Sequence, residues 1–441
     1  MRGAEALSDR QAWRAMALLC CLFALSFLDR MVLALVVDPV RTSLNVTDNQ
    51  ISLLFGFGFV IVYVLSGFPA AHLVDSGRRK QILIGGVVLW STATLLSGFA
   101  TSYPMLAIFR SGVAIGEAVL MPAAMSLISD LFPREKRSLP TTIYTLTGVM
   151  MGAGSFIVGA GALKLAELLA PSLGFEPWRI MFVIVAVPGP VLAALVLWLV
   201  PGSPRKASAE GAATASFQDF AAHFRSNAGL YLPVFLGTGS IFTVALGMSA
   251  WGPTLLVREH GVAQASGGLF MGIFAIGGAL TAMVIVTPLV KLLGPKSRVH
   301  GVLRTGVLLN LTALPILAVA IGLDDIRLVL TGVAVGTLGS IATATFTPLV
   351  LQSVTPTPLL GRMSAVYLMF NNLMGMGMGP VLVSALAARV DSERNIGTAM
   401  TIVAWSAIAV SLTCYLFALW RLRGRAPLAP GAAATPSTQA G

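Results

Sequence analysis

Charged residues are scarce in this sequence, and their scarcity excludes most soluble folds. Asp, Glu, Lys and Arg make up 11% of the 441 residues, whereas an ordinary soluble domain is roughly a quarter charged. Hydrophobic residues make up 56%, and the mean hydropathy is +0.85. Because water could not solvate so much apolar surface, the composition predicts an integral membrane protein.

Histidine and cysteine are equally sparse, and neither builds a site. The four histidines lie at the ends of apolar segments or in loops, without the paired spacing of a metal site, and the three cysteines give no disulfide framework. A P-loop and a hydroxyl-nucleophile motif are also missing. We therefore expect no enzyme activity, no metal and no cofactor, and the competing interpretation as a membrane enzyme gains no support.

Long apolar segments, in contrast, recur along the whole chain. A bilayer core about 30 Å thick needs roughly 20 mostly apolar residues per helical crossing, and twelve windows meet that need without the alternation typical of β-barrel strands. The predicted fold is all-α, with twelve transmembrane helices in two groups of six. The first six windows are 13–37, 51–73, 82–100, 105–132, 139–163 and 180–200. The second six are 230–257, 267–289, 302–321, 328–351, 363–388 and 398–420.

The longest polar stretch between windows divides the chain into two halves. Residues 201–229 are predicted to be a cytoplasmic linker between bundles at 1–200 and 230–420, and the Pro- and Ala-rich tail at 421–441 is expected to be disordered. Glycines interrupt the fifth window of each half, as in repeated transporter folds whose site lies between the halves, although close helix packing also explains them. These glycines are Gly148, Gly152, Gly154, Gly159 and Gly161, and then Gly375, Gly377 and Gly379.

Positive charge is distributed unevenly between alternate loops. Basic clusters at 78–80, 134–137 and 421–425 fall on one side, and the loops of the other side are poor in Lys and Arg. Because basic loops remain in the cytoplasm, both termini are predicted to lie there, in a bacterial-type inner membrane. The net charge of +11 is spread over these short clusters, which argues against nucleic acid as a partner.

Four ionisable residues lie inside predicted spans, where each charge costs ~2.5–3.5 kcal/mol on insertion scales. Asp29 and Arg30 are sequence neighbours in the first span and point about 100° apart on a helix, so each needs a partner elsewhere. Arg110 and Glu117 share one face of the fourth span, roughly 10 Å apart. If these two spans are neighbours, Asp29 can meet Arg110 and Arg30 can meet Glu117.

The buried charges allow two interpretations. In the functional one, a carboxylate takes up a proton when substrate or rocking of the halves draws its arginine away, which couples transport to protons. In the structural one, the pairs only lock the helices. The second half has no comparable mid-span charge, so its cavity is expected to be lined by uncharged polar groups. The candidates are Asn371, Asn372, Thr238, Ser240 and Thr243.

The residues around these charges resemble a known family. The run Phe-Leu-Asp-Arg at 27–30 and the run at 110–118, which ends in Gly-Glu-Ala, resemble the Spinster-like branch of the major facilitator superfamily. The likeness continues at 129–133, at 137–138, at Trp178 and Arg179, at Trp251 and Arg258, and at Asn372 ahead of Gly379 and Pro380. It implies the major facilitator fold, with two six-helix bundles that rock around a central cavity without ATP, and it places Asp29, Arg30, Arg110 and Glu117 in the family's charged cluster.

The resemblance also implies a cytoplasmic gate, in which acidic and basic side chains latch the halves in one state. The gate residues are Asp75, Arg79, Lys80, Asp130 and Arg137. The loop departs from the family motif Gly-x-x-x-Asp-Arg-x-Gly-Arg-Lys, because Ala71, Ser76 and Arg78 replace its first Gly, its first Arg and its second Gly. The fifth span lacks the Gly-Pro pair of the antiporter motif, so export by exchange gains no support.

The sequence therefore predicts a secondary active transporter of a small or amphipathic organic solute, such as an organic anion or a lysolipid-like molecule. Its expected partners are that solute, protons and membrane lipids, and a monomer is expected. A sensor or assembly protein that keeps the carrier fold is the alternative, but it would need a larger output domain than the short tail. A channel is disfavoured because buried opposite charges would obstruct an open pore.

Overall fold

The computed structural model describes residues 9–75, 78–200, 216–294, 298–390 and 395–422. Within these ranges nearly every residue is helical. Most of the predicted linker, at 201–215, and most of the predicted tail, at 423–441, lie outside the described residues. The two statements about those segments therefore stay predictions.

Among the described residues, twelve helical segments are long and apolar enough to cross a membrane, as the hydropathy pattern predicted. The first half contains α1 (Asp9–Val32) with η1 (Leu33–Leu35), α2 (Val37–Leu44), α3 (Asp48–Phe55), α4 (Phe57–Asp75), α5 (Arg79–Ser97), α6 (Tyr103–Ala118), α7 (Leu120–Leu131), η2 (Arg134–Lys136), α8 (Ser138–Leu173), α9 (Pro177–Ala186) and α10 (Pro188–Leu199). The second half contains α11 (Phe217–His260), α12 (Gln264–Leu293), α13 (Arg298–Leu311), α14 (Ala313–Ala320), α15 (Ile326–Val354), α16 (Thr357–Asn372), η3 (Leu373–Met378), α17 (Gly379–Ala387) and α18 (Asn395–Leu422).

The two largest differences from the predicted boundaries lie at the start of α11 and at the end of α8. Helix α11 begins at Phe217, because Ser216 and Asp219 form a capping box, so the last part of the predicted linker 201–229 belongs to a membrane helix. Helix α8 continues past the predicted end at residue 163 to Leu173, where Gly174 closes it in the left-handed conformation with a φ of 68°. Hydropathy could not locate either end, since both extensions are set by caps.

Helix packing inside the first half depends on close backbone contact between α5 and α6. A methyl group added at Gly116 would lie 2.6 Å from the carbonyl oxygen of Gly86 and 2.7 Å from the amide nitrogen of Trp90. Glycine is therefore required at this crossing, as in other close contacts between membrane helices. The contact fixes α6, which carries two of the four buried charges, against the bundle.

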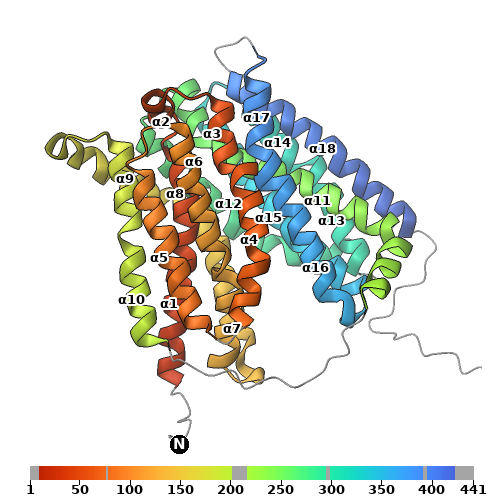
Figure 1. The fold of residues 1–441 in the computed structure, drawn as a ribbon. Coiled ribbons are helices and arrows are strands. Elements are labelled where there is room, and N and C mark those ends of the chain that lie inside the picture. The colour runs from red at the N-terminus through yellow and green to blue at the C-terminus, as the bar shows by residue number, and fades with distance from the viewer. Residues whose placement is uncertain (1–8, 76–77, 201–215, 295–297, 391–394, 423–441) are drawn as a thin grey trace, which may run out of the picture.

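The two halves meet mainly at the end of the molecule away from Asp9 and Leu422, called here the far side; the other end is the terminal side. Helices α8 and α12 contact each other around Ile157 and Gly272, where an added methyl group would lie 3.0 Å from the Ile157 amide nitrogen. Gly56 approaches the second half at Gly377 in the same way. Toward the terminal side the two sets of ribbons diverge (Figure 1). The halves are thus in close contact on the far side.

The α5–α6 crossing predicts that alanine substitutions at two adjacent glycines differ sharply in their effect on stability. Gly86→Ala places a methyl group 2.8 Å from the Gly116 carbonyl oxygen, whereas Gly85→Ala meets no atom within 4 Å. We expect Gly86→Ala to destabilise the protein by ~1–3 kcal/mol, the usual cost of overpacking, and Gly85→Ala to change little. The measurement is the thermal unfolding midpoint in one detergent, and equal midpoints for the two variants would contradict this packing.

Candidate functional site

The first buried ion pair joins α1 to α6. Arg110 donates from Nη1 to Oδ1 of Asp29 at 3.2 Å and to the Asp29 backbone carbonyl at 3.3 Å. The hydroxyl of Thr94, on α5, donates to the other carboxylate oxygen. Both charged residues are almost fully buried, with 1% and 2% of their surface exposed. The predicted pairing of Asp29 with Arg110 is therefore confirmed.

The second ion pair crosses between the same two helices. Arg30 donates from Nε to Oε2 of Glu117 at 2.6 Å, and Glu117 is 1% exposed. This pairing was also predicted. Each pair keeps one buried atom without a hydrogen-bond partner among the described residues, Nε of Arg110 and Oε1 of Glu117. Since such atoms are costly when unpaired, the cluster retains one unfilled donor and one unfilled acceptor.

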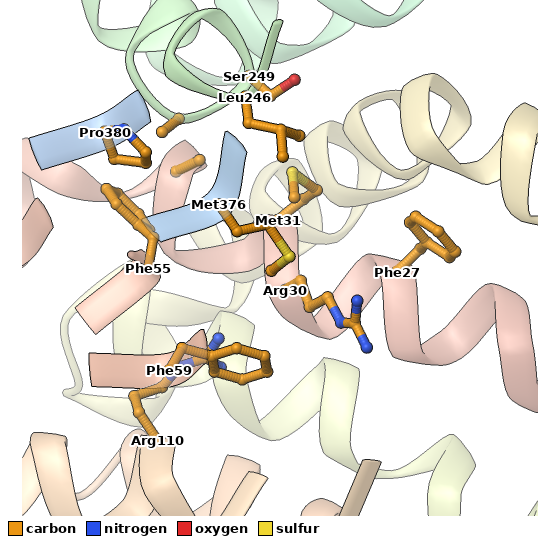
Figure 2. Close-up of a pocket in the computed structure, with 12 residues that line it drawn as sticks. Phe27, Arg30, Met31, Phe55, Phe59, Arg110, Leu246, Ser249, Met376 and Pro380 are labelled. Atoms are coloured by element: carbon orange, nitrogen blue, oxygen red, sulfur yellow. The ribbon is translucent and has the colours of Figure 1, made fainter. Parts of the chain in front are cut away.

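A pocket lies beside the two pairs, between the halves of the protein. It has a volume of about 580 Å³, counting the space open at its mouth. Both arginines reach its wall, whereas the remaining lining is apolar and aromatic except for one serine (Figure 2). The lining residues are Phe27, Arg30, Met31, Ala34, Phe55, Phe59, Arg110, Leu246, Ser249, Ala250, Met376 and Pro380. This arrangement can hold an apolar body beside two cationic groups.

A cluster of charges joins the two halves on the far side of the molecule. Arg258, near the end of α11, donates to Asp38 at 2.6 Å and 2.8 Å and to Asp48 at 2.8 Å and 3.0 Å. The two aspartates belong to the first half and the arginine to the second, so these bonds link the halves directly. We call these three residues the outer latch. Sequence reasoning did not predict it, although opposite charges in loops of the same side were an available signal.

Comparison with known proteins identifies the family. A sequence profile of the Major Facilitator Superfamily matches residues 19–380. The chain belongs to the major facilitator superfamily. It is 28% identical over 425 residues to an MFS-type efflux pump of Mycolicibacterium smegmatis, and the alignment covers 95% of each chain. It is 29% identical over 252 residues to the protein spinster of Drosophila melanogaster, which covers 56% of this chain and 39% of the fly protein.

Solved structures show the same fold in other members of the superfamily. A bacterial homologue of the human lysosomal transporter Spinster, in an inward-facing and unoccupied conformation, superposes with a TM-score of 0.81 at 21% identity, covering 96% of this chain and 100% of that one. A D-xylose-proton symporter superposes with a TM-score of 0.66 at 16% identity, covering 92% and 96%. The resemblance to the Spinster-like branch is thus confirmed, and the superfamily points to a non-enzymatic transporter.

In this superfamily member, the uncharged polar residues predicted to face the cavity lie apart from the pocket lining. Thr238 shares hydrogen bonds with Thr347 at 2.7 Å and with Tyr415 at 3.1 Å, inside the second half. Thr243 donates to backbone carbonyls at 2.9 Å and 3.0 Å, and Ser240 donates to one at 2.8 Å. These hydroxyl groups form hydrogen bonds within the second half.

The two predicted asparagines lie at the end of α16. Asn371 is buried, and its side-chain oxygen has no hydrogen-bond partner among the described residues, whereas Asn372 is half-buried. Neither belongs to the pocket lining. The second half instead contributes Ser249, which the sequence analysis did not single out because one serine in an apolar helix carries no signal.

Four of the five predicted gate residues contact other parts of the first half in this structure: Arg79, Lys80, Asp130 and Arg137. Arg79 forms an ion pair with Asp130. Lys80 donates to a carbonyl of α10 at 2.7 Å, and Arg137 donates to carbonyls at the end of α7 at 2.6 Å and 2.9 Å. Asp75 ends α4, and its side chain lies outside the described part of the chain. These contacts brace one end of the first half.

The two buried ion pairs predict that removing one charge of a pair destabilises the protein much more than removing both. Arg110→Met leaves Asp29 buried without its cation and should cost about 3–5 kcal/mol, whereas adding Asp29→Asn should recover much of that loss. The measurement is a double-mutant cycle on thermal unfolding midpoints. Lys164→Met is the control, since its pair with Glu167 is at 3.3 Å on the surface and should contribute less than about 1 kcal/mol. Additive effects of the two buried changes would contradict the pairing.

Proposed function

We propose that this protein is a secondary active transporter that moves an amphipathic organic solute with an anionic group across a bacterial-type inner membrane, together with protons. The observation that carries the proposal is the pocket between the halves, where two arginines adjoin an otherwise apolar, aromatic lining. Guanidinium groups bind carboxylates and phosphates in bidentate fashion. The apolar wall, built by residues such as Phe55 and Met376, suits a hydrocarbon body.

We infer proton coupling from the ion pairs, because each arginine of the pocket is already paired with a carboxylate. Arg30 is held by Glu117 at 2.6 Å, so an anionic solute has to compete with that carboxylate. If Glu117 takes up a proton, Arg30 is released toward the pocket and can bind the anion. By linkage, the bound anion favours protonation of Glu117 to the same extent. Proton and anionic solute then bind together, and the combined load brings no net charge into the pocket.

Alternating access assigns roles to the two ends of the molecule. Both termini would lie in the cytoplasm, which the positive charge of the terminal-side loops favours. The outer latch then closes the periplasmic side while the pocket faces the cytoplasm, the arrangement named for the Spinster homologue with a TM-score of 0.81. In the opposite state the latch would open and the cytoplasmic gate, with Arg79 and Asp130, would close against the second half.

Replacing Glu117 tests the coupling. Glu117→Gln removes the titrating group while keeping its shape, so the acceleration of transport by an imposed pH gradient should disappear. The measurement is flux of a labelled single-chain anionic lipid or fatty acid into proteoliposomes at two pH gradients. Glu167→Gln, on the surface of α8, is the matched control and should retain the response. A gradient-driven flux like that of the wild type in Glu117→Gln would refute the coupling role.

Replacing Arg110 tests the anion site. Because charge-assisted hydrogen bonds contribute ~1.5–3 kcal/mol, Arg110→Gln should weaken binding of an anionic single-chain lipid by about tenfold or more. Binding of an uncharged lipid of equal chain length should change little. The measurement is thermal stabilisation of the purified protein by each ligand over a concentration series. Equal weakening for both ligands would show that the arginine shapes the pocket and does not bind the anion.

The outer latch predicts a shift between the two states of the carrier. Arg258→Gln breaks the bonds to Asp38 and Asp48, and the population open to the far side should rise by about tenfold or more. The measurement is labelling of a cysteine placed at Ser249, in a background without native cysteines, by an impermeant reagent added from the far side. Arg41→Gln is the control, since its side chain is 50% exposed and lies 3.6 Å from Asp48. Unchanged labelling in Arg258→Gln would remove the latch from the mechanism.

A further inference from the structure

The four buried charges belong to the first half alone, whereas alternating access moves one half relative to the other. Some element must therefore pass the state of the charges to the second half. The second membrane span, built from α3 and α4, lies between them, and it contacts both α6 and η3. Gly56 joins α3 to α4 in a non-helical conformation, with φ −92° and ψ −120°. Ser52 and Phe55 lie on the α3 side of this joint. Phe59 and Tyr63 lie on the α4 side, four positions apart and so on one face of that helix.

The α3 part of this span is in close contact with the second half. Ser52 donates to the backbone carbonyl of Pro380 at 3.0 Å. The ring of Phe55 lies edge-on to the ring of Trp251, with centroids 6.3 Å apart. Trp251 donates to the same Pro380 carbonyl at 3.0 Å. The two halves thus share one carbonyl acceptor at this level.

Gly56 brings the backbones of the two halves into direct contact. An added methyl group would lie 2.8 Å from the carbonyl oxygen of Gly377, within the π-helical turn η3. There is no side chain between the two backbones to absorb a movement. Both backbones are irregular at this contact, because Gly56 interrupts the span between α3 and α4 and η3 is a π-helical turn. A displacement of α4 is therefore expected to act on η3.

Phe59, on α4, lies between the two ion pairs. Phe59 is 3% exposed, and the guanidinium carbons of Arg30 and Arg110 lie 5.7 Å and 5.6 Å from its ring centroid. Figure 2 shows the ring between these two side chains. Tyr63 stacks on Phe59 with centroids 6.1 Å apart, and its ring lies 5.0 Å from the Arg30 guanidinium. One ring thus contacts the cation of each pair.

We propose that Phe59 is a positioning residue that couples the charge state of the two ion pairs to the position of the second half. The inference rests on the proposed function and deepens it. A ring face attracts a cation most strongly where water is excluded. When Arg30 turns from Glu117 to an anion in the pocket, the attraction on one side of Phe59 changes and the ring has to shift.

The path from Phe59 to the second half is short. Phe59 lies three residues from Gly56, so a movement of the ring that displaces the start of α4 also displaces the backbone that contacts Gly377. The second half then responds through η3, next to the carbonyl of Pro380 that Ser52 and Trp251 share. The side chain of Phe59 has no hydrogen-bonding group, so its contribution depends on the ring itself. A leucine of similar bulk would fill the space without attracting either cation.

The test compares four variants by the distance between spin labels on the terminal side. Labels at Lys136 and Arg225, in the full-length protein without native cysteines, report separation of the halves in nanodiscs. Glu117→Gln mimics the protonated carboxyl and should change the distance distribution. In a double-mutant cycle, Phe59→Leu should reduce that change at least about fivefold, within the usual range of allosteric coupling. Phe59→Tyr, which retains a ring, should preserve it.

Controls separate coupling from packing. Phe68→Leu, at a 70% exposed position of the same helix, should leave the response intact, and Phe59→Met replaces Phe59→Leu if the leucine variant does not yield folded protein. An additive cycle, or no effect of Glu117→Gln on the distances, would overturn the proposal. A coupled cycle in a protein whose flux ignores pH would reject proton coupling while keeping the role of Phe59, so the two failures are distinguishable.

Discussion

Two ion pairs buried between the first and fourth membrane spans are the constraint on which the rest of this structure depends. A lone charge in hydrocarbon is expensive, and Asp29 and Arg30 cannot satisfy each other because they point to different sides of one helix. Their partners have to come from α6, at 3.2 Å and 2.6 Å. The helices of the first half are thereby fixed in register, and four charges add no net charge to the bilayer.

The two ion pairs carry no net charge, but not all of their hydrogen-bonding atoms have partners. Nε of Arg110 and Oε1 of Glu117 lack hydrogen-bond partners among the described residues, and both arginines reach the pocket wall. A structure built only for stability would gain from replacing such pairs with apolar side chains. The incomplete pairing, together with the adjoining pocket, favours exchange of partners over a permanent lock.

The two halves divide the work unequally. The first half holds the charged cluster, whereas the second half supplies an uncharged wall, the π-helical turn η3 and the arginine of the outer latch. In the proposed mechanism, the latch opens and closes in each cycle, whereas the buried ion pairs exchange their partners with a proton or an anionic solute.

Much of this structure could be predicted from the sequence alone. The twelve spans and the two groups of six follow from hydropathy, because the bilayer requires continuous apolar length. The pairing of Asp29 with Arg110 and of Arg30 with Glu117 could be predicted from depth on the condition that the first and fourth spans are neighbours, and the tertiary structure meets that condition. The rotation of each helix about its own axis does not follow, since residues facing lipid and residues facing the core are equally apolar. Only the tertiary structure therefore decided that Phe59 lies between two arginines, that Thr238 faces its own bundle and that Arg258 reaches Asp38 across the halves.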